Sequence, residues 1–294
     1  MAVDVSSQPK RRHVRLSVAI PASLVSDIPH LREKTLRIGF IGRALAIFRV
    51  EEVIIYPDIP NIDQSRDSSL IGEILSYMET PQYLRRRLFK IRPELRFVGI
   101  LPPLRTPHHP TRSKERGLKI GEYRDGVVVS SDERGAMVDI GVERPILIPK
   151  ALLQRNLRVT VKVKKKGKNF IGELSDPNQI KTYWGYEVRI SKSPLGRILK
   201  EGKYDLTIAT SRLGRPIADV LNEISDLWGK SKRVLIAFGS PTRGLKEILK
   251  DENISLENAF HFTINTIPNQ GVKTVRTEEA IYATLSLLNF LFPD

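Results

Sequence analysis

The sequence predicts an α/β fold that is interrupted by a small β-barrel, and two observations lead to this class. Strand-like and helix-like segments alternate at the beginning and at the end of the chain, which is the pattern of α/β proteins. Between them, from Gly121 to Leu174, only short strand-like runs occur, and turn residues separate them. A length of 294 residues suits one large domain or two.

We therefore divide the chain into three parts. Residues 1–13 are expected to form a basic, flexible tail that ends in Lys10-Arg11-Arg12. Residues 14–105 and 179–294 together form a discontinuous α/β domain. Residues 106–178 form the inserted barrel.

In the first α/β part, the pattern predicts a strand, a helix, a second strand and further helices. Apolar residues alternate with other residues between Val14 and Ile20, which is typical of a strand. An apolar face predicts a helix over residues 35–50. The next segments are a short buried strand over 52–56, a polar loop over 57–67, and helices over 69–79 and 82–90.

The inserted part contains five strand-like runs, which suits a five-stranded barrel. These runs cover residues 126–130, 136–140, 146–148, 157–164 and 170–174. A proline-rich and basic segment, 102–116, is the expected crossing loop.

The α/β pattern returns after Asp176-Pro177. It predicts strands over residues 205–210, 233–238 and 260–265, and helices over 217–228 and 277–291. Thr277 is the expected N-cap of the last helix. The acidic residues that follow it suit the positive end of the helix dipole.

Composition excludes several classes of protein. The chain has no cysteine, which excludes a disulfide framework, a cysteine nucleophile and a thiolate zinc site. No apolar run is long enough to span a bilayer, and the first 15 residues lack the apolar core of a secretory signal. We therefore expect a cytoplasmic protein without a membrane partner. Neither G-x-G-x-x-G nor G-x-x-x-x-G-K-[ST] occurs in the candidate ligand loops, so a dinucleotide or NTP site is not supported.

The charge balance points to a polyanionic partner. The chain has 48 Lys or Arg residues against 33 Asp or Glu, a net charge of +15, and this excess favours nucleic acid over a merely charge-rich surface. Residues 106–178 have 15 basic and 9 acidic residues, a net charge of +6. Five lysines between Lys162 and Lys168 form either a solvated hairpin tip or an edge that contacts phosphates.

Three loops follow the last three predicted strands, at residues 210–216, 239–245 and 265–271. Ligands of open α/β sheets bind beyond the carboxyl ends of the strands, and glycine lets the backbone approach a ligand closely. Each loop alone is typical of an ordinary turn. Together they predict a ligand pocket.

His108 and His109 are adjacent and flanked by prolines. Neighbouring side chains of an extended chain point in different directions, and partner ligands for a metal are missing from the nearby sequence. We interpret the pair as a rigid linker feature or an RNA contact rather than a metal site, and we expect no metal.

Several segments carry a more specific signal. They are residues 16–21 (Leu-Ser-Val-Ala-Ile-Pro), 43–48, 81–85 (Pro-Gln-Tyr-Leu-Arg), 106–109, 183–189, 204–208, 238–239 and 276–280 (Arg-Thr-Glu-Glu-Ala). These segments resemble the SPOUT superfamily of RNA methyltransferases, and most closely its archaeal and eukaryotic branch with an inserted β-barrel. The resemblance covers nearly the whole chain after residue 13. The last segment also resembles the knot motif of bacterial ribosomal RNA uridine-N3 methyltransferases.

The resemblance implies a trefoil-knotted α/β domain with an inserted OB-like barrel. In this superfamily the knot binds S-adenosyl-L-methionine, largely through backbone groups. The matching positions are Thr210, Ser211, Gly239, Gly244, Asn265, Thr266, Ile267, Gln270, Val275, Thr277 and Ala280. Ser240 departs from the Gly-Gly start of this loop in relatives.

The resemblance also implies the reaction, which is metal-free methyl transfer to N3 of a uridine in ribosomal RNA. Arg43, on the first long helix, matches a functional arginine that holds a phosphate or stabilises charge on the base. Without the resemblance, Arg43 is interpreted as a surface ion-pair residue. Arg276 is a second catalytic candidate, or else part of a structural ion pair.

The OB-like barrel implies RNA binding, with Lys164, Lys165, Lys166 and Arg85 as the expected contacts. The superfamily implies a homodimer formed through the knotted domain, with the active site near the interface. Two other functions remain open. One is a non-catalytic RNA-binding ribosome-assembly factor on the same scaffold, and the other is a 2′-O-ribose methyltransferase.

Overall fold

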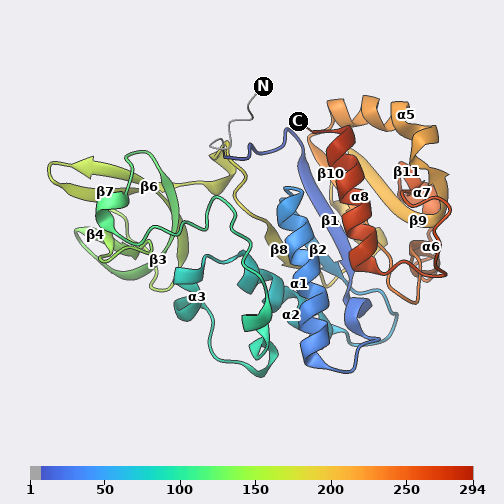
Figure 1. Cartoon of the computed structure of the whole chain (residues 1–294), viewed down its shortest axis with the longest axis horizontal. Coiled ribbons are helices and arrows are strands. Elements are labelled where there is room, and N and C mark those ends of the chain that lie inside the picture. Colours follow the sequence, from blue (N-terminus) through green and yellow to red (C-terminus); the bar gives the residue numbers. More distant parts are fainter. Residues whose placement is uncertain (1–7, 294) are drawn as a thin grey trace. The chain divides into compact units, whose positions relative to one another are not determined.

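The computed structural model describes residues 8–293, which form two compact units (Figure 1). The first unit contains the barrel and comprises residues 8–11, 79–92 and 103–184. The second contains a parallel sheet and comprises residues 12–78, 93–102 and 185–293. Residues 79–92, 103–105 and 179–184, which we expected to belong to the α/β domain, group with the barrel in this division.

The barrel of the first unit is closed, and its five strands follow the order β3-β4-β5-β7-β6. All five predicted runs are strands, each slightly longer or shifted relative to its prediction. Alternate residues such as Val138, Ile148 and Val161 fill the core of the barrel. The elements of this unit are α3 (Gln82–Leu88), β3 (Tyr123–Asp132), β4 (Gly135–Asp139), β5 (Ile146–Pro149), β6 (Arg158–Lys166) and β7 (Asn169–Ser175).

The N-terminal segment is more ordered than the sequence predicts. Residues 1–7 of the expected tail lie outside the described residues. Arg11 donates its N–H to the carbonyl of Lys181 at 2.8 Å, and Tyr183 donates to the carbonyl of Pro9 at 2.9 Å. The prediction of a flexible tail is therefore wrong for residues 9–11, which pair with the chain as it leaves the barrel.

The second unit is built on a six-stranded, fully parallel sheet with the strand order β11-β9-β10-β1-β2-β8. The central strands are buried along nearly their whole length because helices cover both faces of a parallel sheet. The strands are β1 (Arg15–Pro21), β2 (Glu52–Tyr56), β8 (Glu187–Ile190), β9 (Leu206–Pro216), β10 (Arg233–Ala237) and β11 (Phe262–Asn265).

Helices form a layer on each face of this sheet. Three short helices, α4, α6 and α7, bury Leu195, Leu245 and Leu256 on one face. The long helices α1 and α8 lie side by side on the other face (Figure 1). The helices of this unit are α1 (Leu31–Ile47), α2 (Ser65–Glu79, whose last residue belongs to the first unit), α4 (Leu195–Glu201), α5 (Ile217–Lys230), α6 (Leu245–Lys250), α7 (Leu256–Ala259) and α8 (Thr277–Leu291).

Two differences from the predicted elements affect the candidate pocket. Strand β9 does not end at Thr210: it bulges and resumes its pairing with β11, where Ile264 lies opposite Arg215. Strand β11 begins at Phe262 rather than at residue 260, because the preceding residues form α7, capped by the Ser255 side chain. None of the helices formed by the described residues has the length and apolar character needed to cross a membrane.

Candidate active site

A pocket of about 320 Å³ lies at the carboxyl ends of β10 and β11 and beside the bulge of β9. These strands are neighbours in the sheet, so their carboxyl ends meet at one edge, as predicted from the three loops. The volume is within the range of small-molecule sites, ~300–1,000 Å³. The lining includes all eleven positions that the sequence analysis selected: Thr210, Ser211, Gly239, Gly244, Asn265, Thr266, Ile267, Gln270, Val275, Thr277 and Ala280.

Two threonine hydroxyls donate to backbone carbonyls at the end of β10 and just after it. Thr210 donates to the carbonyl of Ala237 at 2.9 Å, and Thr277 donates to the carbonyl of Gly239 at 3.1 Å. The prediction of Thr277 as an N-cap is therefore wrong. Arg276 is the N-cap residue, and its N–H donates to Glu279 Oε2 at 2.8 Å. These two hydroxyls therefore already have partners within the protein.

The loop from Gly239 to Gly244 is a tight, internally bonded turn. Ser240 donates its N–H to the carbonyl of Arg243 at 2.9 Å, and its hydroxyl accepts from the N–H of Arg243 at 3.0 Å. A Cβ at Gly239 would lie 2.9 Å from the carbonyl oxygen of Arg243, so only glycine fits there. At the other end, Gly244 donates its N–H to the Glu247 carboxylate, which begins α6.

The bulge of β9 lies directly on β11. A Cβ at Gly214 would be 2.6 Å from the carbonyl carbon of Ile264, so the two backbones are in contact. Asn265 donates from Nδ2 to the carbonyl of Arg212 at 3.0 Å, and Arg212 donates from Nη1 to the carbonyl of Lys273 at 2.9 Å. Two walls of the pocket are thereby joined.

The pocket is cationic. Its charged lining residues are Arg212, Arg243, Lys246, Lys273 and a single carboxylate, Glu247, which is occupied as a helix cap. No histidine or aspartate occurs among the described residues that line it. This lining can stabilise negative charge on a bound molecule, whereas it offers no unoccupied general base.

Neither candidate catalytic arginine lines this pocket. Arg43 is half-buried on α1, and its positive charge opposes the rise in the pKa of Tyr282 that burial causes, which places it near α8. Arg276 is exposed and immediately precedes α8.

The candidate RNA-binding residues lie in the first unit. Lys164, Lys165 and Lys166 are exposed on β6, and Lys164 forms an ion pair with Glu173 at 2.6 Å. Arg85 is half-buried and donates from Nε to the carbonyl of Thr80 at 2.9 Å, so part of its guanidinium is occupied inside the unit.

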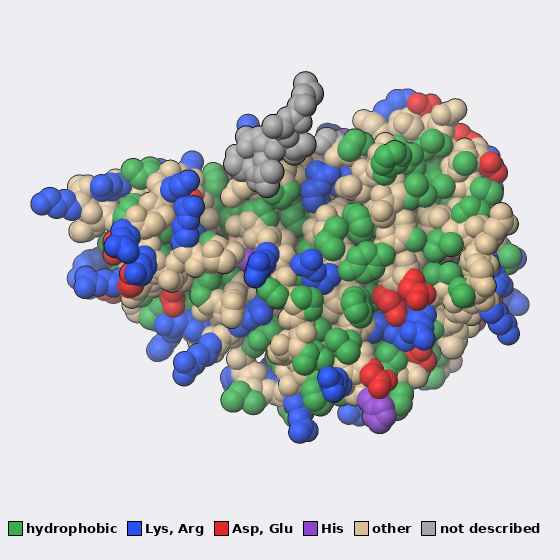
Figure 2. Space-filling view, viewed as in Figure 1, with side chains coloured by type: hydrophobic (Ala, Val, Ile, Leu, Met, Phe, Trp, Pro, Cys, Tyr) green, Lys and Arg blue, Asp and Glu red, His purple; other side chains and the backbone are tan. Residues whose placement is uncertain are grey.

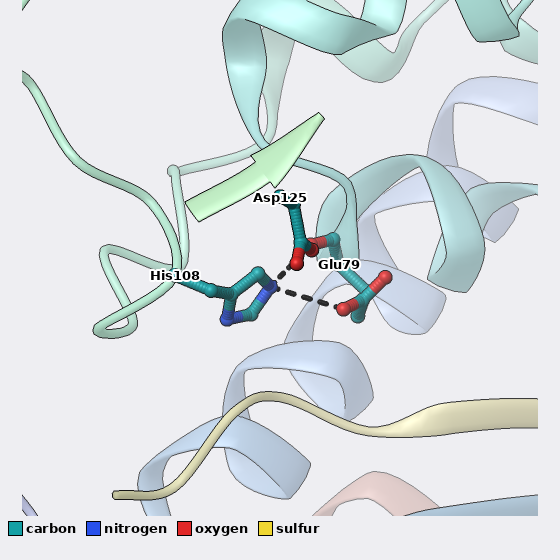
Figure 3. A group of neighbouring side chains, drawn as sticks. All are labelled: Glu79, His108 and Asp125. Atoms are coloured by element: carbon teal, nitrogen blue, oxygen red, sulfur yellow. Dashed lines mark hydrogen bonds and ion pairs between the residues drawn. The ribbon is translucent and has the colours of Figure 1, made fainter. Parts of the chain in front are cut away.

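Sequence reasoning missed a buried cluster in the first unit, formed by Glu79, His108 and Asp125 (Figure 3). One potential metal-ligand atom from each residue lies within 4.8 Å of the others. Arg158 also donates to both carboxylates, to Glu79 Oε2 at 2.6 Å and to Asp125 Oδ2. Trp184 donates its indole N–H to Asp125 Oδ1 at 2.9 Å.

The histidines belong to this network. His108 is fully buried, and its Nε2 lies 3.0 Å from Glu79 Oε1 and 2.8 Å from the Glu79 carbonyl oxygen. His109 Nε2 lies 2.6 Å from the same carbonyl. Both imidazoles therefore contact the Glu79 carbonyl inside the first unit, and the complete burial of His108 leaves its side chain no surface for RNA.

Electrostatics show how the cluster is balanced. Burial opposes the ionisation of Glu79, but Arg158 and His108 outweigh it and hold the pKa of this carboxyl well below its usual range. Burial, together with the charge of His108, lowers the pKa of His109 to about 4. Because the Arg158 guanidinium already forms ion pairs with both carboxylates, the chemistry of the cluster fits an ion-pair network better than a cation site.

A parallel α/β sheet with a ligand pocket at its carboxyl edge, accompanied by a basic barrel, defines an α/β ligand-binding protein with an added β-barrel. A family described as putative RNA methyltransferases matches residues 15–288. The chain belongs to this family.

Individual relatives match over most of the chain. A human protein named 28S rRNA (uridine-N(3))-methyltransferase is 33% identical over 309 residues, which cover 94% of this chain and 78% of the human protein. A Drosophila melanogaster protein of the same name is 32% identical, covering 98% of this chain and 64% of its own length. An uncharacterized protein of Haloarcula marismortui is 32% identical over 92% of this chain and 98% of its own length.

Proposed function

We propose that this chain transfers a methyl group from S-adenosyl-L-methionine to N3 of a uridine in ribosomal RNA. The observation that carries the proposal is the gathering of all eleven selected positions around one pocket at the carboxyl edge of the sheet. Membership of an RNA methyltransferase family supports the reaction, and the names of the human and fly relatives support the acceptor atom.

The pocket fits this cofactor in its chemistry. Ile267, Val275 and Ala280 offer apolar surface for an adenine ring, and the glycine-containing loop offers backbone groups that can read the edge of the ring. The threonine hydroxyls have partners within the protein, which suits recognition by the backbone.

We also assign the second unit to the SPOUT superfamily, with a trefoil knot around β9 and β11. The contact between Gly214 and Ile264 supports this assignment, because it brings the bulge of β9 against the strand that precedes the last segment of the chain. The bonds that join Asn265 and Lys273 to Arg212 support it further.

The lining residues suit methylation of a uracil nitrogen. When bound, the cofactor supplies a methyl group on a positively charged sulfur. The N3–H of uracil must lose its proton before or during transfer, and the negative charge then spreads over the ring. Arg212, Lys246 and Lys273 favour that anion, so the proton can leave to solvent without a dedicated base.

The chain is proposed to act as a homodimer joined through α1 and α8. Large apolar side chains are exposed on these helices: Phe40 is 55% exposed, Ile47 48% and Phe290 81%. Figure 2 shows hydrophobic side chains gathered over the two helices, and we call Phe40, Ile47 and Phe290 the apolar face. A second copy is its expected partner.

The dimer gives Arg43 a role. It lies on α1 between Phe40 and Ile47 and does not line the pocket of its own chain. We place it at the pocket of the partner subunit, where a guanidinium can hold a phosphate or stabilise the charged base. Arg276, exposed beside the pocket, is kept as a second candidate for the substrate side.

The test combines cofactor binding with product analysis. Calorimetry with S-adenosylhomocysteine should show micromolar binding that Ala280→Leu abolishes, because the larger side chain fills the pocket. Ala283→Leu, one turn further along α8, should bind normally. Digestion of methylated ribosomal RNA should yield 3-methyluridine. A 2′-O-methylated nucleoside would overturn the acceptor atom, and a folded wild-type protein without cofactor binding would favour the assembly factor.

A further inference from the structure

The β6–β7 hairpin sorts its lysines onto two sides. Val161 and Val163 are fully buried in the barrel core. Because successive side chains of a strand point to opposite faces, the residues between and beyond them face outward. We call these the lysine row: Lys162, Lys164 and Lys166.

Lys165 lies on the other side of the strand, in line with Val163. It is exposed because it extends past the core, near the turn at Gly167. Lys165 therefore provides a matched comparison: it has the same charge and lies on the same strand, but points in the opposite direction.

The lysine row has one acidic neighbour. Glu173 lies directly opposite Lys162 and forms an ion pair with Lys164 at 2.6 Å. Its side chain is 52% exposed, so an incoming phosphate can displace it. Alternate residues of a strand are about 6.8 Å apart, which is comparable with the separation of neighbouring phosphates along a nucleic-acid strand.

Acidic and basic side chains are unevenly distributed between the turns of the barrel. The turn between β3 and β4 carries Asp132, Glu133 and Arg134, whereas the turn of the β6–β7 hairpin carries lysine without an acid. Figure 2, seen as in Figure 1, shows Lys and Arg side chains concentrated over the barrel and at the tip of the projecting hairpin.

Exposed rings for stacking bases are missing from the described part of the first unit. The ring of Tyr123 is half-buried, with Lys162 Nζ 5.5 Å from its centroid, and Phe170 packs against the barrel core. The remaining aromatic residues of this unit are Tyr83, Phe89, Tyr183 and Trp184, all half-buried or buried. Proteins that recognise single-stranded bases use exposed rings as stacking platforms.

We infer that the β6–β7 hairpin binds the sugar–phosphate backbone of RNA through the lysine row and does not discriminate between bases. The inference rests on the proposed function in that it takes RNA as the substrate. Selection of the target uridine is then left to the second unit, and the hairpin contributes affinity that is independent of sequence.

The experiment is a salt titration of RNA binding by the full chain, followed by fluorescence anisotropy. The probes are two labelled RNA hairpins of equal length and different sequence. Lys164→Gln/Lys166→Gln should reduce the slope of log K against log salt by about 1.5 for both probes, since each phosphate contact contributes ~0.7–0.9. Lys165→Gln should leave the slope unchanged.

A third variant tests the sign of the effect. Glu173→Gln removes the acidic neighbour and frees Lys164, so RNA affinity should rise by about threefold at low salt, the scale of one exposed ion pair. A fall in affinity would contradict the lysine row.

The inference is overturned if the double variant keeps the wild-type slope, if Lys165→Gln loses as much, or if affinity follows the base sequence of the probe. Methyl transfer to ribosomal RNA by the wild-type chain tests the proposed function separately. If the wild-type chain transfers methyl groups but the double variant keeps the wild-type salt slope, only the hairpin inference is wrong. If the wild-type chain does not bind the cofactor, only the proposed function is wrong.

Discussion

Arg243 donates a hydrogen bond from Nη1 to the carbonyl oxygen of Asp58 at 2.7 Å, which joins the pocket loop to the chain just after β2. Asp58 is buried, and its carboxylate accepts from the N–H of Ser23 at 3.0 Å and from Gln64 Nε2 at 2.9 Å. The loop that lines the pocket is therefore held against a rigid corner of the sheet.

Removing this bond should weaken cofactor binding. Arg243→Ala is expected to lower the affinity for S-adenosylhomocysteine by about tenfold, because a charged hydrogen bond that orders the loop contributes ~1.5–3 kcal/mol. Calorimetry measures the change. Gln64→Leu, which does not line the pocket, should weaken binding in the same direction by loosening Asp58. A normal affinity for Gln64→Leu would mean that Arg243 acts by direct contact instead.

Mixing subunits distinguishes an arginine that acts across the dimer from one that acts within its own chain. Arg43→Ala and Ala280→Leu should each abolish methyl transfer. In a mixed dimer, the intact pocket of the first variant meets the intact arginine of the second. Activity should return to about a quarter of the wild-type value when the two variants exchange subunits statistically. If the subunits exchange but methyl transfer activity does not return, Arg43 acts on the pocket of its own subunit.

A charge on the apolar face should separate the subunits. Phe40→Glu places a carboxylate in the proposed interface and should yield monomers in sedimentation equilibrium, with methyl transfer reduced by at least tenfold. Ile62→Glu, which changes an equally exposed apolar residue away from α1 and α8, is the control and should remain dimeric. A wild-type chain that sediments as a monomer would sink the proposed dimer.

The buried network of the first unit should be sensitive to the loss of its cation. Arg158→Met leaves Glu79 and Asp125 without their shared partner, and breaking a buried ion pair costs ~3–5 kcal/mol. Urea unfolding, followed by the combined fluorescence of Trp184 and Trp228, should report this loss. Adding Glu79→Gln to Arg158→Met should restore part of the lost stability, because it removes one unpaired buried charge. A double variant that is less stable than Arg158→Met would contradict the network.

His109 predicts a specific dependence of stability on pH. Its pKa falls from 6.5 to about 4 on folding, so the unfolded chain binds the proton more readily. The free energy of unfolding should therefore have its full value above pH ~6.5. It should decrease as the pH falls from ~6.5 to ~4, by at most about 3 kcal/mol.

His109→Gln keeps an N–H donor for the Glu79 carbonyl and should flatten this decline between pH 6.5 and 5. The depressed pKa of Glu79 acts at lower pH, since its contribution is lost only as the pH falls below the unfolded value of ~4.3. An unchanged pH profile in the variant would remove His109 as the cause.

Local patterns were sufficient for the elements that position the pocket. Alternation and apolar faces predicted β1, β2 and the barrel strands, and the predicted helix over residues 277–291 matches α8. The short helices α4, α6 and α7 were missed, because four to seven residues do not complete a recognisable helical period. The pocket positions came from the resemblance and lie together because parallel strands end at one edge.

The buried network could not be predicted in the same way. Glu79, His108, Asp125 and Arg158 are spread over 79 residues of the sequence and share no local spacing. The pairing of β3 with β6 brings Asp125 to Arg158, whereas Glu79 reaches the same guanidinium from the end of α2. For the same reason, the pairing of residues 9–11 with 181–183 left no signal in either segment.

The position of β1 in the sheet has a consequence for synthesis on the ribosome. This strand emerges before the barrel, yet one of its two parallel partners is β10, where Leu16 pairs with Val234. The barrel, whose strands are mostly antiparallel neighbours, can fold while one edge of β1 still has unpaired backbone groups. We expect nascent chains that stop before residue 233 to hold a folded barrel and an unfinished, chaperone-dependent sheet, which limited proteolysis of stalled chains can reveal.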